Sequence, residues 1–87
     1  MITVYTKDDC PFCVKAKALL NEHGLEYTEI NINEDKTARH FIMLEGHTTV
    51  PQLYTDKDEL FVKGGYEGLR EHFEKQNTQN TLGELSL

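Results

Sequence analysis

Residues 2–13 decide the fold, and they read Ile-Thr-Val-Tyr-Thr-Lys-Asp-Asp-Cys-Pro-Phe-Cys. The first five of them are β-branched or aromatic, which predicts a short strand. Proline is well tolerated at the first position of a helix, because its missing N–H would be unpaired there anyway. Pro11 therefore predicts the start of a helix, with Cys10 at the N-cap and Cys13 about one turn into the helix.

Cys10 and Cys13 are the only cysteines of the chain, and their spacing limits what they can do. A disulfide between them closes such a small loop that it would stabilise the fold very little. A structural zinc site needs four ligands, and the histidines at positions 23, 40, 47 and 72 lack the spacing of a finger-like pair. We therefore expect no metal, and we interpret the pair as a redox dithiol.

The composition restricts the partners of the chain. Its 87 residues suffice for one small domain. Its formal charge of −6 repels phosphate backbones, and no apolar run approaches the roughly 20 residues that span a bilayer. The N-terminus lacks a basic segment followed by an apolar one, so we expect no signal peptide. We predict a cytoplasmic, monomeric protein that binds neither nucleic acid nor a membrane.

The rest of the chain alternates between strand and helix patterns. Helices are predicted at residues 11–23, 36–45 and 66–75, and strands at 2–6, 27–33, 50–55 and 60–63. The order β-α-β-α-β-β-α predicts an α/β fold with a four-stranded mixed sheet flanked by three helices. We assign residues 1–75 to the domain and residues 76–87 to a polar C-terminal tail.

The two thiols are predicted to have unequal roles. A thiol reacts as its thiolate, and a sulfur at the N-cap accepts hydrogen bonds from helical amides, here those of Phe12 and Cys13. The helix dipole and Lys7 add positive charge there, whereas the adjacent Asp8 and Asp9 oppose the thiolate. We expect Cys10 to be the exposed nucleophile and the more buried Cys13 to be the resolving thiol.

Two further motifs each allow two interpretations. In the stretch 48–51, Thr-Thr-Val-Pro, the proline either begins a strand or forms a cis bond that leaves the Val50 N–H and C=O free for a peptide. In the stretch 64–67, Gly-Gly-Tyr-Glu, the glycines either form a flexible turn or open an anion site at the start of the last helix.

Together these motifs resemble the glutaredoxin family. The strand followed by Cys10-Pro11-Phe12-Cys13 is similar to the active-site strand and helix of the family, Thr49-Val50-Pro51 to its Thr-Val-Pro motif, and Gly64-Gly65 to its double-glycine motif. The resemblance covers roughly residues 1–75 and looks most like small phage and bacterial members. It implies a thioredoxin-like fold, a cis Pro51, and glutathione as co-substrate.

The resemblance also implies a set of glutathione-binding residues. Lys7, helped by Arg39, would pair with the glycyl carboxylate of glutathione. Val50, which lies between Thr49 and Pro51 in the Thr-Val-Pro motif, would pair with the backbone of the glutathione cysteine. The backbone amides of Tyr66 and Glu67, after Gly65, would hold the γ-glutamyl carboxylate, and Phe12 would pack beside the tripeptide. The sequence departs from the family at Gly68, where many members have an aspartate.

The predicted function is glutathione-dependent reduction of protein disulfides and glutathionylated mixed disulfides by Cys10 and Cys13. The resemblance also suggests ribonucleotide reductase as one candidate protein substrate. One alternative is a thioredoxin-like electron donor recharged by a flavoprotein reductase. A second alternative is a metal-binding module to which two chains contribute these cysteines.

Overall fold

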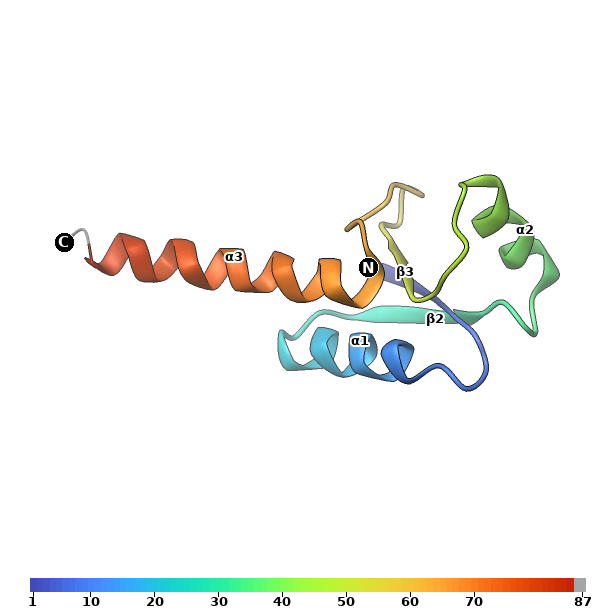
Figure 1. Ribbon diagram of the computed structural model, residues 1–87, viewed down its shortest axis with the longest axis horizontal. Coiled ribbons are helices and arrows are strands. Elements are labelled where there is room, and N and C mark those ends of the chain that lie inside the picture. Colours follow the sequence, from blue (N-terminus) through green and yellow to red (C-terminus); the bar gives the residue numbers. More distant parts are fainter. Residues whose placement is uncertain (86–87) are drawn as a thin grey trace.

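The N-terminal strand β1 (Ile2–Thr6) lies at the centre of a three-stranded mixed sheet of order β2-β1-β3 (Figure 1). It runs parallel to β2 (Tyr27–Asn31), with Val4 opposite Glu29, and antiparallel to β3 (Gln52–Tyr54), with Val4 opposite Leu53. The predicted mixed sheet is confirmed. The carboxyl end of β1 leads directly into the loop that carries Lys7 and Cys10.

The computed structural model describes the backbone of residues 1–85 and the side chains of residues 1–75. Within this part of the chain, no helix has both the length and the apolar character needed to cross a bilayer.

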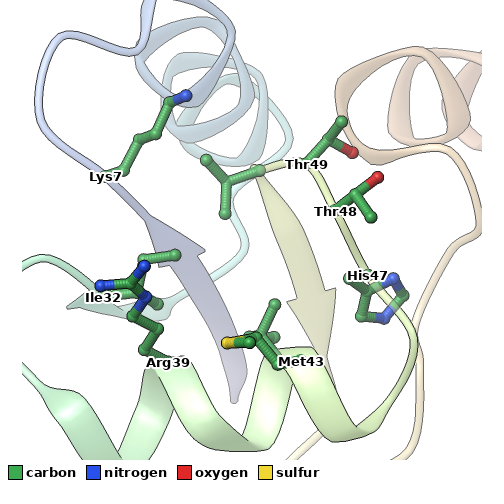
Figure 2. Close-up of a pocket in the computed structure, with 9 residues that line it drawn as sticks. Lys7, Ile32, Arg39, Met43, His47, Thr48 and Thr49 are labelled. Carbon is green, nitrogen blue, oxygen red and sulfur yellow. The ribbon is translucent and has the colours of Figure 1, made fainter.

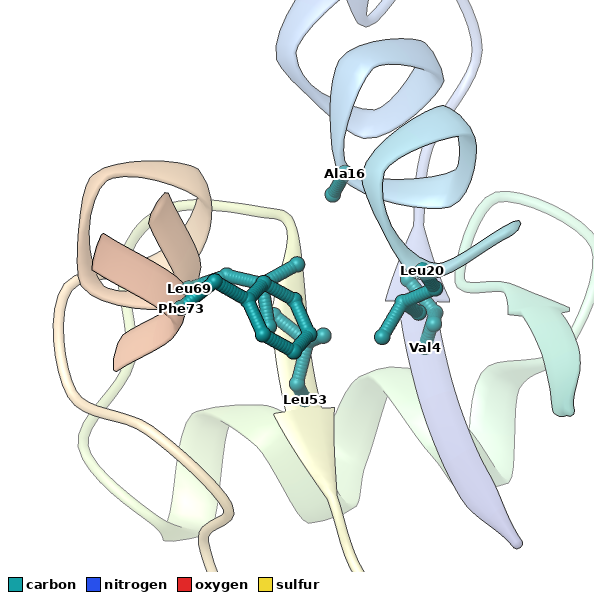
Figure 3. Packing of buried hydrophobic residues seen from close by; sticks show 6 residues of the cluster. All are labelled: Val4, Ala16, Leu20, Leu53, Leu69 and Phe73. Atoms are coloured by element: carbon teal, nitrogen blue, oxygen red, sulfur yellow. The ribbon is translucent and has the colours of Figure 1, made fainter. Parts of the chain in front are cut away.

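Three helices cover the two faces of the sheet: α1 (Pro11–Glu22), α2 (Lys36–Leu44) and α3 (Gly65–Leu85). Because successive strand residues point to opposite faces, Val4 and Leu53 pack against α1 and α3 on one face. This cluster consists of Val4, Ala16, Leu20, Leu53, Leu69 and Phe73 (Figure 3). Tyr5 and Tyr54 pack against α2 on the other face. Together the two clusters hold α1, α2 and α3 against the sheet.

The predicted helix starts are confirmed. Cys10 is the N-cap of α1, with Pro11 as its first helical residue. Asp35 is the N-cap of α2, and its Oδ1 accepts a hydrogen bond of 3.0 Å from the Ala38 amide. Each cap satisfies an amide that has no partner within the helix.

The predicted fourth strand at residues 60–63 is wrong. Leu60 forms only an isolated antiparallel bridge with Tyr54, and the Phe61 amide donates to the Leu53 carbonyl at 2.8 Å. The chain then leaves the edge of β3, because the next few residues must carry it to the start of α3 beside Pro51. Phe61 and Val62 pack on the hydrophobic cluster instead of extending the sheet.

The last helix is longer than predicted. We expected it to end at Lys75, and α3 continues to Leu85. The segment 76–85 is rich in Asn, Gln and Thr but contains no proline, and such residues cost only a few tenths of a kcal/mol each in a helix. Part of the predicted tail, residues 86–87, lies outside the described residues, and the domain boundary at residue 75 stays a prediction.

Candidate active site

Cys10 and Cys13 form a disulfide at the start of α1, with their Cα atoms 5.3 Å apart. The Cys13 amide donates a hydrogen bond of 3.2 Å to Cys10 Sγ, so the N-cap sulfur accepts from one of the two expected helical amides. Cys13 is 2% exposed, whereas Cys10 is half-buried. The predicted difference in burial between the two sulfurs is confirmed.

The loop before Cys10 is held at the end of β2. The Asp8 amide donates to Asn33 Oδ1 at 2.7 Å, and Asp8 Oδ1 accepts from Asn31 Nδ2 at 2.8 Å. Asp9 has a φ of 53°, a left-handed conformation that aspartate tolerates better than most residues. These contacts direct the Asp8 carboxylate towards the asparagines, so Asp8 has a structural role in addition to its charge.

The peptide bond between Val50 and Pro51 is cis, as the family resemblance implies. The Val50 carbonyl oxygen lies 3.9 Å from Cys10 Sγ. The preceding carbonyl, that of Thr49, accepts a hydrogen bond of 2.9 Å from Gln52 Nε2. The backbone of residue 50 therefore lies directly beside the exposed sulfur of the pair.

A cavity of about 300 Å³ opens on one side of Val50 (Figure 2). Two cations line it, Lys7 from the loop after β1 and Arg39 from α2, and Figure 2 shows Thr48 and Thr49 on the opposite side of the opening. The other lining residues are Ile32, Ile42, Met43, His47 and Val50. The cavity thus offers positive charge, which suits a carboxylate.

His47, which we did not predict for the site, is tied to the buried core. Its Nε2 lies 2.8 Å from the Tyr54 hydroxyl, which donates to Glu45 Oε1 at 3.2 Å. Burial, and then the nearby Glu45 carboxylate, raises the pKa of Tyr54 to about 12. The bond fixes the histidine ring at the edge of the cation-lined cavity.

A second cavity, of about 240 Å³, lies on the other side of Val50. The start of α3 lines it with Gly64, Gly65, Tyr66 and Glu67, and Phe12, Thr49, Val50 and Pro51 complete it. The first amides of a helix have no intrahelical acceptor and favour an anion. The Phe12 and Tyr66 rings lie 6.0 Å apart, and Lys15 Nζ lies 5.2 Å from the Phe12 ring centroid.

A third cavity, of about 430 Å³, lies on the helix side of the cysteines. Its lining comprises Lys7, Asp9, Cys10, Pro11, Cys13, Val14, Lys17 and Glu29. Lys17 Nζ contacts both Glu29 carboxylate oxygens, at 3.0 and 3.1 Å, and Thr6 Oγ1 donates to Glu29 Oε2 at 2.8 Å. The hydrogen bonds from Lys17 and Thr6 hold the pKa of Glu29 below its usual value.

Every residue predicted for glutathione binding lines one of the first two cavities, and these cavities share Thr49 and Val50. The roles of those residues stay predictions. Sequence reasoning missed Thr48 and His47 in the first cavity, and Lys17 and Glu29 beside the cysteines. The position of Lys17, four residues after Cys13 on one helix, was the available signal for that residue.

Comparison with known proteins agrees with this geometry. The profile of the glutaredoxin family matches residues 2–61. Escherichia coli glutaredoxin 3 is 38% identical over 60 residues, covering 68% of this chain and 72% of that protein. The hybrid peroxiredoxin hyPrx5 of Haemophilus influenzae is 39% identical over 72 residues, covering 83% of this chain. The chain spans only 29% of the length of that peroxiredoxin.

Two solved structures are also similar. Glutaredoxin 1 of Francisella tularensis, solved with cacodylate, superposes with a TM-score of 0.65 at 27% identity, covering 88% of this chain and 95% of that one. The glutaredoxin-like NrdH-redoxin of Escherichia coli gives a TM-score of 0.60 at 26% identity, covering 62% and 71%. The fold and the dithiol at the helix start define a thioredoxin-like thiol-disulfide protein. More particularly, the chain belongs to the glutaredoxin family.

Proposed function

We propose that the protein is a glutathione-dependent thiol-disulfide oxidoreductase that acts on protein disulfides and glutathionylated proteins. The observation that carries this proposal is the position of Cys10 beside Val50, where two cavities meet. One cavity is lined by Lys7 and Arg39, and the other by the start of α3. A tripeptide with a carboxylate at each end and a thiol in the middle matches this arrangement.

The proposed reaction has two stages. The Cys10 thiolate attacks one sulfur of the substrate disulfide, and the other substrate sulfur leaves as a thiolate and takes up a proton. The Cys13 thiol then loses its proton and attacks Cys10 Sγ, which releases the second substrate sulfur and forms the Cys10–Cys13 disulfide. Two glutathione molecules reduce this disulfide to two thiols and become glutathione disulfide.

The charge distribution supports binding of an anionic tripeptide despite the formal charge of −6. Lys7 and Arg39 bring two cations to one cavity, and the α3 dipole contributes about half a positive charge at the other. Such local donors act over a few ångströms, whereas charges farther than about 8 Å are largely screened at physiological salt.

Removing each cysteine separately tests the mechanism. Cys10→Ser should abolish thiol transfer, because no nucleophile remains at the N-cap. Cys13→Ser should keep the removal of glutathione from glutathionylated substrates, because glutathione can resolve the mixed disulfide, but should lose the dithiol route. The assay follows hydroxyethyl disulfide reduction by glutathione, coupled to glutathione reductase. Equal activity of Cys10→Ser and the wild type would refute the assignment of Cys10 as the nucleophile.

A thioredoxin-like electron donor is the second candidate, and the start of α3 supports it. The Glu67 carboxylate accepts two hydrogen bonds from Arg70, at 2.9 and 3.2 Å, and Gly68 has no side chain. An added Cβ at Gly68 would overlap the Lys63 carbonyl oxygen, so this backbone leaves no room for an aspartate. The γ-glutamyl amine would therefore find its carboxylate partner already engaged.

The reductase that recharges the protein separates the two candidates. We expect turnover with glutathione and glutathione reductase, and little turnover with thioredoxin reductase and NADPH. The opposite result would favour the electron donor, whose structural precedent is the similarity to NrdH-redoxin. Wild-type protein and Cys13→Ser are compared in both systems, because only a protein with both cysteines can form the intramolecular disulfide that accepts electrons from a flavoprotein reductase.

A further inference from the structure

The third cavity places an ion pair beside the resolving cysteine. Cys13 and Lys17 are four residues apart on α1, so their Cβ atoms lie about 5–6 Å apart on one helix face. Both residues line the cavity, together with Glu29. The first two cavities lie around Val50 and include neither Lys17 nor Glu29. The ion pair therefore belongs to the Cys13 side of the site.

The fold fixes the position of this ion pair. Glu29 lies on β2 opposite Val4 of the central strand, and its carboxylate accepts from Thr6, which is 1% exposed. Lys17 reaches across from α1 and contacts both oxygens of that carboxylate. Because the Glu29 carboxylate is held by its strand and by the buried Thr6 hydroxyl, its two contacts keep the Lys17 ammonium near the Cys13 turn of the helix.

We propose that Lys17 and Glu29 set the ionisation of the Cys13 thiol, and thereby the rate at which Cys13 resolves a mixed disulfide on Cys10. The inference rests on the dithiol mechanism proposed above. The Lys17 ammonium favours the Cys13 thiolate, and the Glu29 carboxylate opposes it. Lys17 and Glu29 are positioning residues here, because they act on the thiol and do not touch the substrate.

The other charges around the cavity belong to the loop before α1. Lys7 and Asp9 line the cavity as well, and with Lys17 and Glu29 they are the charged groups that surround it within the described residues. Lys7 and Asp9 lie beside Cys10, whereas Lys17 lies one turn further along the helix than Cys13. Lys17 and Glu29 are thus the pair whose change should alter the second thiol more than the first.

The resolving step is an intramolecular thiol-disulfide exchange that needs no external oxidant or reductant. The Cys13 thiol gives its proton to water, and its thiolate attacks Cys10 Sγ of the mixed disulfide. The Cys10–Cys13 bond forms and the bond to the leaving sulfur breaks. The leaving thiolate then takes up a proton. Only the thiolate attacks, so the rate below the pKa of Cys13 follows the fraction ionised.

The reaction of the reduced protein with 4,4′-dithiodipyridine tests the proposal. This neutral disulfide releases one thiopyridone when Cys10 attacks and a second when Cys13 resolves the mixed disulfide, so the two steps appear as two absorbance phases. Lys17→Met should slow the second phase about threefold at neutral pH, the effect of one charge several ångströms away in a solvated site. Its pH profile should move up by about half a unit.

The sign pattern across the variants separates an electrostatic role from a structural one. Glu29→Gln should speed the second phase and move its pH profile down. The double variant Lys17→Met with Glu29→Gln should lie close to the wild type, and Lys17→Arg should retain the wild-type rate. Lys15→Met is the matched control, since Lys15 lies over the Phe12 and Tyr66 rings and does not line this cavity. It should leave the second phase unchanged.

The proposal would be overturned if the rate of the second phase were unchanged in the variants, or if this rate fell in both Lys17→Met and Glu29→Gln. It would also be overturned if Lys17→Arg slowed the second phase as much as Lys17→Met. A fall in both single variants would indicate that the ion pair only holds the helix in place, and urea denaturation of each variant would then show a matching loss of stability. The assay contains no glutathione. Failure of glutathione turnover and failure of this inference are therefore separate results.

Discussion

At the scale of single residues, Gly65 joins two parts of the site. A Cβ at this position would lie 2.7 Å from the Pro51 carbonyl oxygen, and the residue has a φ of 58°. Gly65→Ala should therefore destabilise the fold by about 2–3 kcal/mol, because a steric clash adds to the cost of a left-handed alanine. Urea denaturation measures the change, and activity with glutathione should fall as the second cavity is distorted.

Gly24→Ala is the control for this substitution. Gly24 also has a positive φ, 69°, but an added Cβ there meets nothing within 4 Å. We expect a loss of only about 1 kcal/mol, due to the backbone conformation alone. Equal losses at the two positions would mean that the close approach of α3 to Pro51 has no energetic consequence.

The residues that the sequence predicted best are those whose role depends on local structure. Pro11 marks the first residue of α1, and this puts its neighbour Cys10 at the N-cap without any contact from distant parts of the chain. The ion pair of Lys17 and Glu29 was not predicted, because it depends on the parallel register that sets Glu29 opposite Val4. The bond between His47 and Tyr54 likewise requires the turn after α2 to fold back on β3. Such non-local contacts leave no periodic signal in one sequence.

At the scale of elements, the N-cap of α2 supports the first cavity. Asp35→Ala removes the acceptor for the Ala38 amide and should cost about 1 kcal/mol of stability. Because α2 carries Arg39, fraying of its first turn should also raise the KM for glutathione several-fold while kcat changes little. Asp35→Asn keeps the acceptor and should restore both values. An unchanged KM in Asp35→Ala would show that the stability of the first turn of α2 does not affect glutathione binding.

The order of helices and strands could largely be predicted, but their ends could not. Asp35 and the Cys10-Pro11 pair mark helix starts by their own chemistry, and the structure has both. The segment from Leu60 to Lys63 has the composition of a strand, yet the contact of Gly65 with Pro51 draws the chain away from β3. The predicted end of α3 was wrong because residues 76–85 carry no strong signal that ends a helix.

At the scale of the whole molecule, Tyr54 links the core to alkaline stability. Its pKa is raised to about 12 in the folded protein, against about 10 when unfolded. The folded state keeps the proton longer, so this contribution to stability is complete below pH 10 and is lost as pH rises towards 12. Between pH 8 and pH 11 the wild type should therefore lose about 1 kcal/mol more than Tyr54→Phe.

Chemical denaturation at the two pH values checks this prediction. Tyr54→Phe should be less stable than the wild type at pH 8, because it loses the hydrogen bond to Glu45 and the contact with His47. The difference should shrink at pH 11. Burial also raises the pKa of Tyr5, so some alkaline loss should persist in the variant. If the difference in unfolding free energy between the two proteins were the same at both pH values, ionisation of Tyr54 would not be a cause of the alkaline loss of stability.

The cavities around Val50 are lined by five parts of the chain that are distant in sequence: residues 7–12, the residue after β2 (Ile32), α2, residues 47–51 and the start of α3. No single part of the chain holds enough of the lining to bind a ligand by itself. A ligand that occupies both cavities would consequently bind the native state and not the unfolded chain. Its concentration would raise the melting temperature by mass action, so the supply of reducing tripeptide would also govern how long the protein survives heat and proteolysis.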